Sequence, residues 1–95
     1  MQRGINIMMI ETNISYKNDK LQNKRQAARL SQSQLAKAAG ISVRVLQDYE
    51  RGARNVSGAK LSTLLKICNA LKCEMIDIIT DMETKQLLEM YNAEK

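Results

Sequence analysis

Apolar residues recur at helical spacing along most of the chain, and typical helix-capping residues separate the apolar runs. The clearest case is the run from Ser31 to Gly52, SQSQLAKAAGISVRVLQDYERG, which predicts two short helices joined by one tight turn. Ser31 and Gln34 match a capping box, in which a hydroxyl and an amide satisfy backbone donors left unpaired at a helix start. A helix is therefore expected to begin at Gln32, and Gly40 stands where the chain must leave it with a positive φ.

The second helix of this run has one apolar face and one polar face. Ser42 is expected to cap it. Leu46 and Tyr49 lie on one face at i and i+3, where they can pack on Leu35 and Ala36 of the first helix. The opposite face is left for a partner and carries Val43, Arg44, Gln47 and Asp48. Two short helices at a fixed angle, with one polar face outward, are the arrangement of a DNA-reading helix-turn-helix.

The segment resembles the helix-turn-helix of Cro and lambda repressor, the Xre family, from about Lys20 to Thr80. Beyond the motif itself, the run Tyr49-Glu50-Arg51-Gly52 closes the second helix and the run 64–71 forms the next one, both in the family's order. Several such motifs in register are more specific than a helix-turn-helix pattern alone. The resemblance carried by the motif itself rests on Ser31, Ala36, Gly40 and Leu46.

The resemblance implies an all-α fold, a compact five-helix bundle of the lambda-repressor type that inserts its third helix into the major groove. We expect this DNA-binding domain at residues 18–80, preceded by an extension at residues 1–17. A further helix is expected within residues 81–95, where it could serve dimerisation.

Three more helices complete the expected bundle. The first covers about residues 18–29, with Leu21 and Ala28 inward. The fourth is expected to start after a capping Ser57, earlier than is usual in the family, and to reach Leu71. A short fifth helix at about residues 75–79 offers two isoleucines to the core. The apolar stripe of the fourth helix comprises Leu61, Leu64, Leu65, Cys68 and Leu71.

Asp81 is a suitable N-cap for the additional helix, which runs to about Tyr91. One face of this helix is formed by Thr84, Leu87, Leu88 and Tyr91. This face requires a cover, which is either the chain's own bundle or a second subunit.

Residues 1–17 alternate like a strand at Ile5, Ile7 and Met9, yet the chain offers no second strand for them. Disorder is the first expectation, and pairing with a symmetry mate is the alternative. The apolar run is short and is interrupted by Asn6 and Glu11, so a signal peptide, a membrane span and membrane association are not expected. We expect a cytoplasmic protein.

The positive charge is concentrated over the motif. The net charge is +5 over 95 residues, and residues 20–60 hold nine Lys/Arg against two acids. Neutralising phosphates with such side chains provides sequence-independent affinity for DNA. Double-stranded DNA is therefore the predicted partner.

Arg44 is the strongest candidate for reading a base, because its planar fork matches guanine O6 and N7. Gln47 can pair with adenine, and Val43 can pack on a thymine methyl. Asp48 is unusual beside phosphates. It either accepts from cytosine or pairs with Arg44 one turn earlier, and the pairing is the favoured interpretation.

Phosphate contacts are expected on both sides of the groove. Ser31 and Gln32 lie at a helix start, where backbone N–H groups and the dipole attract anions. The resemblance implies that Arg54, Asn55 and Lys60 hold the other strand. Weaker candidates are Lys24, Arg29 and Lys37.

The resemblance further implies a structural ion pair between Arg25 and Glu50, which would lock the third helix to the first. Cys68 and Cys73 are expected to be reduced core residues. The chain has no histidine and no activated-nucleophile motif, so the sequence predicts no enzyme, no cofactor and no metal site.

Two function hypotheses follow. The first is a transcriptional repressor that binds a palindromic operator as a homodimer, with half-sites about one helical turn apart. The second is a protein-interaction module, for example an antitoxin, that grips a protein partner through its C-terminal helix. Whether Leu87, Leu88 and Tyr91 are covered distinguishes the two.

Overall fold

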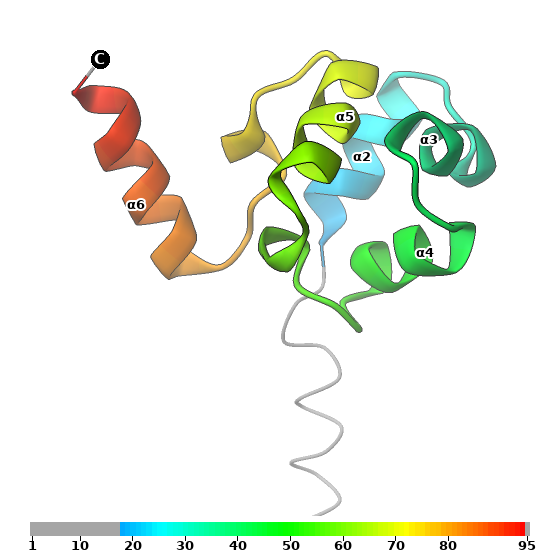
Figure 1. Ribbon diagram of the computed structural model, residues 1–95, viewed down its shortest axis with the longest axis horizontal. Helices are drawn as coiled ribbons and strands as arrows, with labels where there is room; N and C mark the ends of the chain where they lie inside the picture. Colours follow the sequence, from blue (N-terminus) through cyan, green and yellow to red (C-terminus); the bar gives the residue numbers. More distant parts are fainter. Residues whose placement is uncertain (1–17, 95) are drawn as a thin grey trace, which may run out of the picture.

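Helices form all of the regular structure in the computed structural model, which describes residues 18–94 (Figure 1). The α-helices are α2 (Asp19–Ala27), α3 (Gln32–Ala39), α4 (Val43–Arg51), α5 (Leu61–Leu71) and α6 (Met82–Ala93). Two single 3-10 turns, η1 (Val56–Gly58) and η2 (Met75–Asp77), lie between the longer helices. The predicted all-α class is confirmed, whereas the expectations for residues 1–17 lie outside the described range.

The caps of the helix-turn-helix are formed as the sequence predicts. Ser31 Oγ accepts from the backbone N–H of Gln34 at 3.0 Å, and Gln34 Oε1 accepts from the N–H of Ser31 at 2.8 Å. Gly40 has φ 70°, the left-handed conformation that favours glycine. Ser42 Oγ accepts from the N–H of Val45 at 3.1 Å. These local bonds fix where α3 ends and α4 begins.

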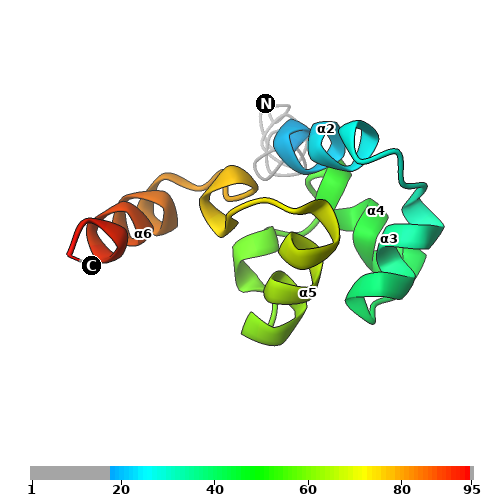
Figure 2. The same ribbon diagram turned by 90° about the horizontal axis from the view of Figure 1, so that it is seen from above.

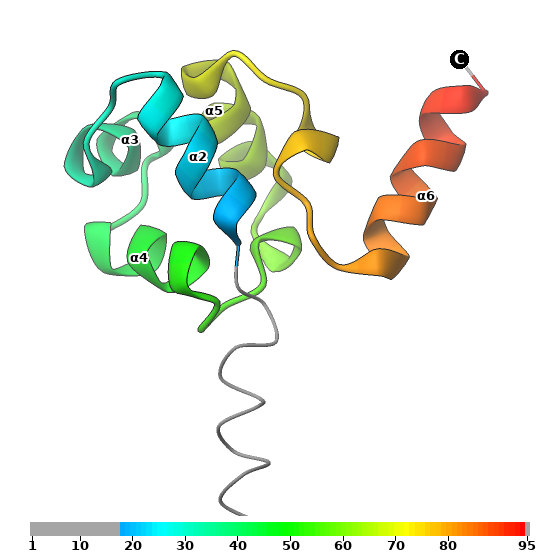
Figure 3. The same cartoon turned by 180° about the vertical axis from the view of Figure 1, so that it is seen from behind.

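The core lies where α3 packs against both α4 and α5, and α2 crosses in front of α5 in the view of Figure 3. Leu35, Leu46 and Ile67 have no exposed surface. Burying one such side chain stabilises the fold by roughly 1.5–3 kcal/mol. The buried apolar residues are Leu21, Leu35, Ala36, Ala39, Leu46, Tyr49, Val56, Leu64, Ile67, Cys68, Leu71, Ile78 and Ile79.

The end of α2 differs from the prediction. Ala28 is exposed, and the helix ends at Ala27 because Arg29 adopts a left-handed φ of 61°. The N–H of Leu30 then donates to the carbonyl of Arg25, closing a Schellman turn. Ala28 therefore does not point inward as predicted, whereas Leu30 is partly buried and packs against the core.

Ser57 does not cap α5, which corrects a second expectation. Asn55 Oδ1 instead accepts from the N–H of Ser57 at 3.1 Å and starts the separate turn η1. The Ser57 hydroxyl donates to Asp81 Oδ1 at 2.8 Å, a partner 24 residues later in the chain. α5 begins after Lys60, with no side-chain cap.

The buried face of α5 also differs from the predicted stripe. Ile67 is fully buried, whereas Leu61 is 61% exposed and Leu65 is 44% exposed. The buried positions 64, 67, 68 and 71 follow the i, i+3, i+4, i+7 spacing, so the predicted stripe was rotated by part of a turn. The predicted helix at residues 75–79 is one 3-10 turn, although Ile78 and Ile79 are buried as expected.

The last helix, α6, projects from one end of the bundle (Figure 2). It contacts the rest of the fold mainly through η2. Asp81 caps it as predicted, accepting from the N–H of Thr84 at 3.2 Å. Leu88 packs partly on the core, but Leu87 and Tyr91 are exposed. Within residues 18–94, none of the helices has the length and apolar character needed to cross a membrane.

Candidate nucleic-acid interface

The outer face of α4 presents two of the predicted base-reading side chains. The side chain of Arg44 is 77% exposed, and Gln47 is exposed on the same side. Val43 is half-buried and packs against the core, so only part of its side chain can reach a partner. The exposed pair Arg44 and Gln47 therefore forms the centre of the candidate interface.

Gln47 is linked to the start of α3 by a chain of hydrogen bonds. Its Nε2 donates to Gln32 Oε1 at 3.2 Å, and Gln32 Nε2 donates to Glu50 Oε1 at 3.1 Å. These residues line a polar hollow of about 420 Å³ between α2, α3 and α4. The link orients the amide of Gln47. It also uses both amide atoms of Gln32, which the sequence predicts as a phosphate ligand.

The predicted ion pair between Arg25 and Glu50 is present and buried. Arg25 Nε lies 2.7 Å from Glu50 Oε2, and Arg25 Nη2 lies 3.2 Å from Glu50 Oε1. A third donor, Arg25 Nη1, reaches the carbonyl of Leu30 at 3.0 Å. Such a bidentate pair is geometrically specific, so it fixes α4 relative to α2.

A buried asparagine adds a second connection at the same place. Asn18 Oδ1 accepts from the N–H of Leu21 at 2.9 Å and caps α2. Its Nδ2 donates to the carbonyl of Ile78 at 2.8 Å, and its backbone N–H donates to the carbonyl of Glu50. Asn18 thus joins α2, α4 and the segment after η2.

Asp48 does not belong to the exposed face, which corrects its predicted place there. It is 8% exposed, and its closest partners are Arg51 Nη2 at 2.7 Å and Arg54 Nε at 3.2 Å. The predicted ion pair with Arg44 is present but longer, with Arg44 Nε 3.9 Å from Asp48 Oδ1. With both oxygens engaged, the carboxylate is poorly placed to accept from a base. The i, i+3 spacing to Arg51 was the sequence signal for this contact.

The arginines also set the ionisation of Asp48. Burial alone would raise the pKa of this carboxyl, but hydrogen bonds from Arg54 and Arg51 outweigh burial and hold the pKa below its usual value. Asp48 is therefore charged at neutral pH. It partly neutralises Arg54, one of the predicted phosphate ligands.

The remaining predicted phosphate ligands lie at helix starts and in the loop after α4. Ser31 is exposed at the start of α3, and Lys60 is exposed at the start of α5. The side chain of Arg54 is 58% exposed. Asn55 is half-buried, and its Oδ1 holds η1 in place. Asn55 therefore also shapes the loop that carries Arg54.

The two cysteines lie in or beside the core. Cys68 is buried and Cys73 is half-buried, and both are free thiols. Burial, and next the neighbouring Cys73, raise the pKa of the Cys68 thiol to about 12. Among residues 18–94, no three side chains of the metal-binding types gather into a cluster.

The model of a helix-turn-helix family matches residues 21–78, more than half of the chain. The chain therefore belongs to this family, the helix-turn-helix proteins of the Cro and lambda-repressor type. It is a DNA-binding helix-turn-helix regulator. A comparison with curated proteins gives no match.

Proposed function

We propose that the protein recognises a specific double-stranded DNA sequence with α4 in the major groove and acts as a transcriptional repressor. One observation carries the proposal: Arg44 and Gln47 are exposed together on a helix that the buried pair of Arg25 and Glu50 holds in place. A rigidly held helix with exposed arginine and amide side chains suits base recognition.

Each exposed side chain has a distinct role in this proposal. Arg44 donates two hydrogen bonds to guanine O6 and N7. Gln47 pairs with adenine, and the hydrogen bond from its Nε2 to Gln32 limits how its amide can turn. The exposed part of Val43 contacts a thymine methyl.

Phosphate contacts position the helix without reading sequence. The start of α3, at Ser31 and Gln32, meets one strand through its N-terminal dipole. Arg54, Asn55 and Lys60 meet the other strand. Lys60 is exposed and has no ion pair within residues 18–94, whereas Arg54 must exchange part of its contact with Asp48 for a phosphate.

A homodimer on a palindromic site completes the proposal, because one small reading helix covers only a few base pairs. Two copies would read half-sites about one helical turn apart. The second function hypothesis, a module that grips another protein, is favoured by one observation, namely the exposed apolar face of α6.

The test is a selection of bound duplexes from a random pool, followed by titration of the selected duplex and a scrambled duplex. The proposal expects an enriched motif with twofold symmetry and at least roughly a thousandfold preference for it over the scrambled duplex. A pool without enrichment, or equal affinity for both duplexes, would overturn sequence-specific recognition.

A further inference from the structure

The end of α5 places two cysteines next to each other. Lys72 adopts a left-handed φ of 55°, and the N–H groups of Lys72 and Cys73 both donate to the carbonyl of Cys68, the latter at 3.1 Å. This is a Schellman turn, which often sets the side chains of residues five apart in contact. At the end of α2 the same turn pairs Arg25 with Leu30, whereas here both residues carry thiols.

The two thiols are in contact, and a small hollow leads to them. A hydrogen bond joins the thiol of Cys68 to that of Cys73. Cys68 is 6% exposed, and Cys73 is half-buried. Both line a hollow of about 280 Å³, whose other walls include Leu65 of α5, Met75 of η2 and Leu88 of α6. A small reagent can therefore reach Cys73 while the fold stays intact.

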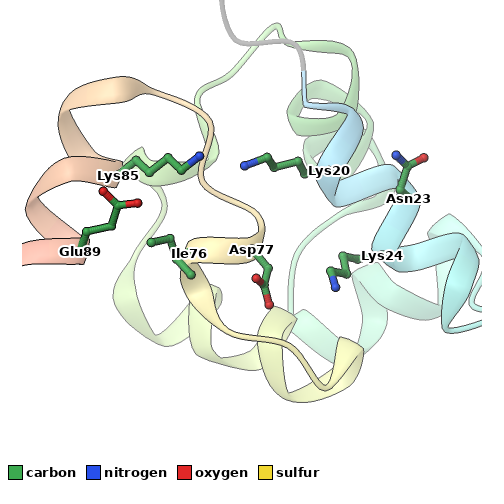
Figure 4. A pocket seen from close by; sticks show the side chains of 7 residues that line it. All are labelled: Lys20, Asn23, Lys24, Ile76, Asp77, Lys85 and Glu89. Atoms are coloured by element: carbon green, nitrogen blue, oxygen red, sulfur yellow. The ribbon is translucent and has the colours of Figure 1, made fainter. Parts of the chain in front are cut away.

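The surroundings of the two thiols differ. Burial raises the pKa of the Cys73 thiol, and the hydrogen bond from Cys68 opposes this rise. Asp77 and Glu74 add to the rise, whereas Lys24 lowers the pKa. Figure 4 shows Lys24 of α2 and Asp77 of η2 on the walls of one hollow of about 590 Å³. For Cys68, burial and next the neighbouring Cys73 raise the pKa to about 12. Cys73 is therefore the thiol that ionises first, and the thiolate is the nucleophile.

We propose that Cys68 and Cys73 form a reversible intramolecular disulfide, and that this pair is the site at which the protein reacts with low-molecular-weight disulfides. A disulfide requires Cα atoms about 4.4–6.8 Å apart, a separation that suits two residues joined by a backbone hydrogen bond. The new bond ties the end of α5 to the segment that carries Ile78, whose carbonyl accepts from Asn18. The inference goes beyond the proposed function and does not rest on it.

The reaction has two exchange steps. The Cys73 thiolate attacks one sulfur of the reagent, so a bond forms to Cys73 Sγ while the S–S bond of the reagent breaks and releases a thiolate. Cys68 gives its proton to that thiolate, and its sulfur attacks Cys73 Sγ and displaces the second half of the reagent, which takes a proton from water. Two protein thiols are thus oxidised to one disulfide, and one reagent disulfide is reduced to two thiols.

The test equilibrates the full-length protein with mixtures of reduced and oxidised glutathione, blocks the remaining thiols with N-ethylmaleimide in acid and measures the intact mass. Wild type is expected to pass from two blocked thiols to none, without a lasting glutathione adduct. The same titration in urea gives the value for the unfolded chain. The squared concentration of reduced glutathione over that of oxidised glutathione at half oxidation should be at least about tenfold higher for the folded protein, because the fold holds the sulfurs in contact.

A second measurement must agree with the first. By thermodynamic linkage, a disulfide that folding favours tenfold lowers the equilibrium constant of unfolding by the same factor. Urea unfolding of the oxidised and the reduced protein measures this constant. Asn69→Ala is the matched control, because Asn69 is exposed and lines the same hollow but carries no thiol. Its redox titration should coincide with that of wild type.

Single variants separate the roles of the two thiols. Cys68→Ala leaves Cys73 without a second thiol, so a mixed disulfide with glutathione should accumulate on Cys73. Cys73→Ala leaves the buried Cys68, which should react at least about tenfold more slowly. Circular dichroism shows whether each variant still folds, and the wild-type titration needs neither variant. Equal rates for the two variants would overturn the assignment of Cys73 as the attacking thiol.

Three results would overturn the disulfide itself. The first is a folded protein that is oxidised no more readily than the unfolded chain, because the turn would then hold the sulfurs in a geometry unsuited to the bond. The second is a wild type that ends as a glutathione adduct. The third is a disulfide between two chains in place of one within the chain, seen as a doubled mass.

Discussion

The helix-turn-helix half and the α5–α6 end of the molecule differ in which side chains they bury and which they leave exposed. In the first, the charged side chains of Arg25, Asp48 and Glu50 are buried, and each has close partners of opposite charge. Over residues 18–94, no buried side-chain nitrogen or oxygen lacks a hydrogen bond. At the α5–α6 end, by contrast, large apolar side chains remain exposed.

The comparison teaches that the two halves have different requirements. A helix that reads bases must be held within a narrow range of positions, and buried charge pairs provide that because their geometry is directional. A surface that takes a partner must instead stay exposed in the single chain. One domain can therefore bury charged side chains in its helix-turn-helix half and still expose large apolar side chains at its other end.

The largest expected effect is a loss of stability when the buried ion pair of the helix-turn-helix half is removed. Arg25→Ala leaves Glu50 buried without its main partner, so the free energy of unfolding should fall by about 3–5 kcal/mol. Urea unfolding followed by circular dichroism measures it. Lys37→Ala, which removes an exposed cation from α3, is the control and should change stability by no more than about 0.5 kcal/mol. A loss under about 1 kcal/mol for Arg25→Ala would mean that this pair does not lock α4.

The next largest effect is expected on DNA recognition, while the stability of the fold stays nearly unchanged. Arg44→Ala should weaken binding to the selected duplex by about 1–3 kcal/mol and leave the free energy of unfolding nearly unchanged, because the side chain is 77% exposed. Fluorescence anisotropy on selected and scrambled duplexes gives both affinities. Lys60→Ala is the comparison: it should weaken both duplexes alike and reduce the salt slope by about one. Equal losses on both duplexes for Arg44→Ala would assign Arg44 to phosphate instead of a base.

The helix ends of the helix-turn-helix could be predicted from the sequence, because each depends on side chains only three or four residues apart in the chain. Ser31, Gly40 and Ser42 were correctly interpreted for this reason. The pairing of Asp48 with Arg44 was predicted, but its exposed position was not confirmed, because its closest charged contacts involve Arg51 and an arginine in the following loop. The bond from Ser57 to Asp81 spans 24 residues and depends on the path of the whole chain, which residue spacing does not encode.

Asp48→Asn tests whether the buried carboxylate of Asp48 weakens binding to DNA. The change removes a charge that phosphates repel and releases Arg51 and Arg54 from their ion pairs. Binding to all duplexes should therefore tighten by roughly threefold at low salt. The same titrations on selected and scrambled DNA measure it. A loss confined to the selected duplex would show instead that Asp48 reads a base.

The same substitution has a pH signature. The pKa of Asp48 is lowered in the folded protein, so its charged form contributes stability above the unfolded pKa of about 3.9, and this contribution is lost as the pH falls through the folded pKa. The stability advantage of wild type over Asp48→Asn should thus shrink as the pH is lowered from about 5. Urea unfolding at several pH values checks this, and a constant difference would contradict it.

The smallest effect compares the helix ends of the two halves. Arg29 after α2 and Lys72 after α5 adopt left-handed φ values of 61° and 55°, which cost a residue with a Cβ more than glycine. Arg29→Gly should raise the free energy of unfolding by about 0.5–1 kcal/mol, after the larger chain entropy that glycine loses on folding is subtracted. Arg29→Ala keeps the Cβ and removes the charge, so it should give no gain. Lys72→Gly relieves the same strain after α5, so its gain should match that of Arg29→Gly. Urea unfolding compares the three variants with wild type, and a loss of stability for either glycine variant would contradict the strain assigned to these two positions.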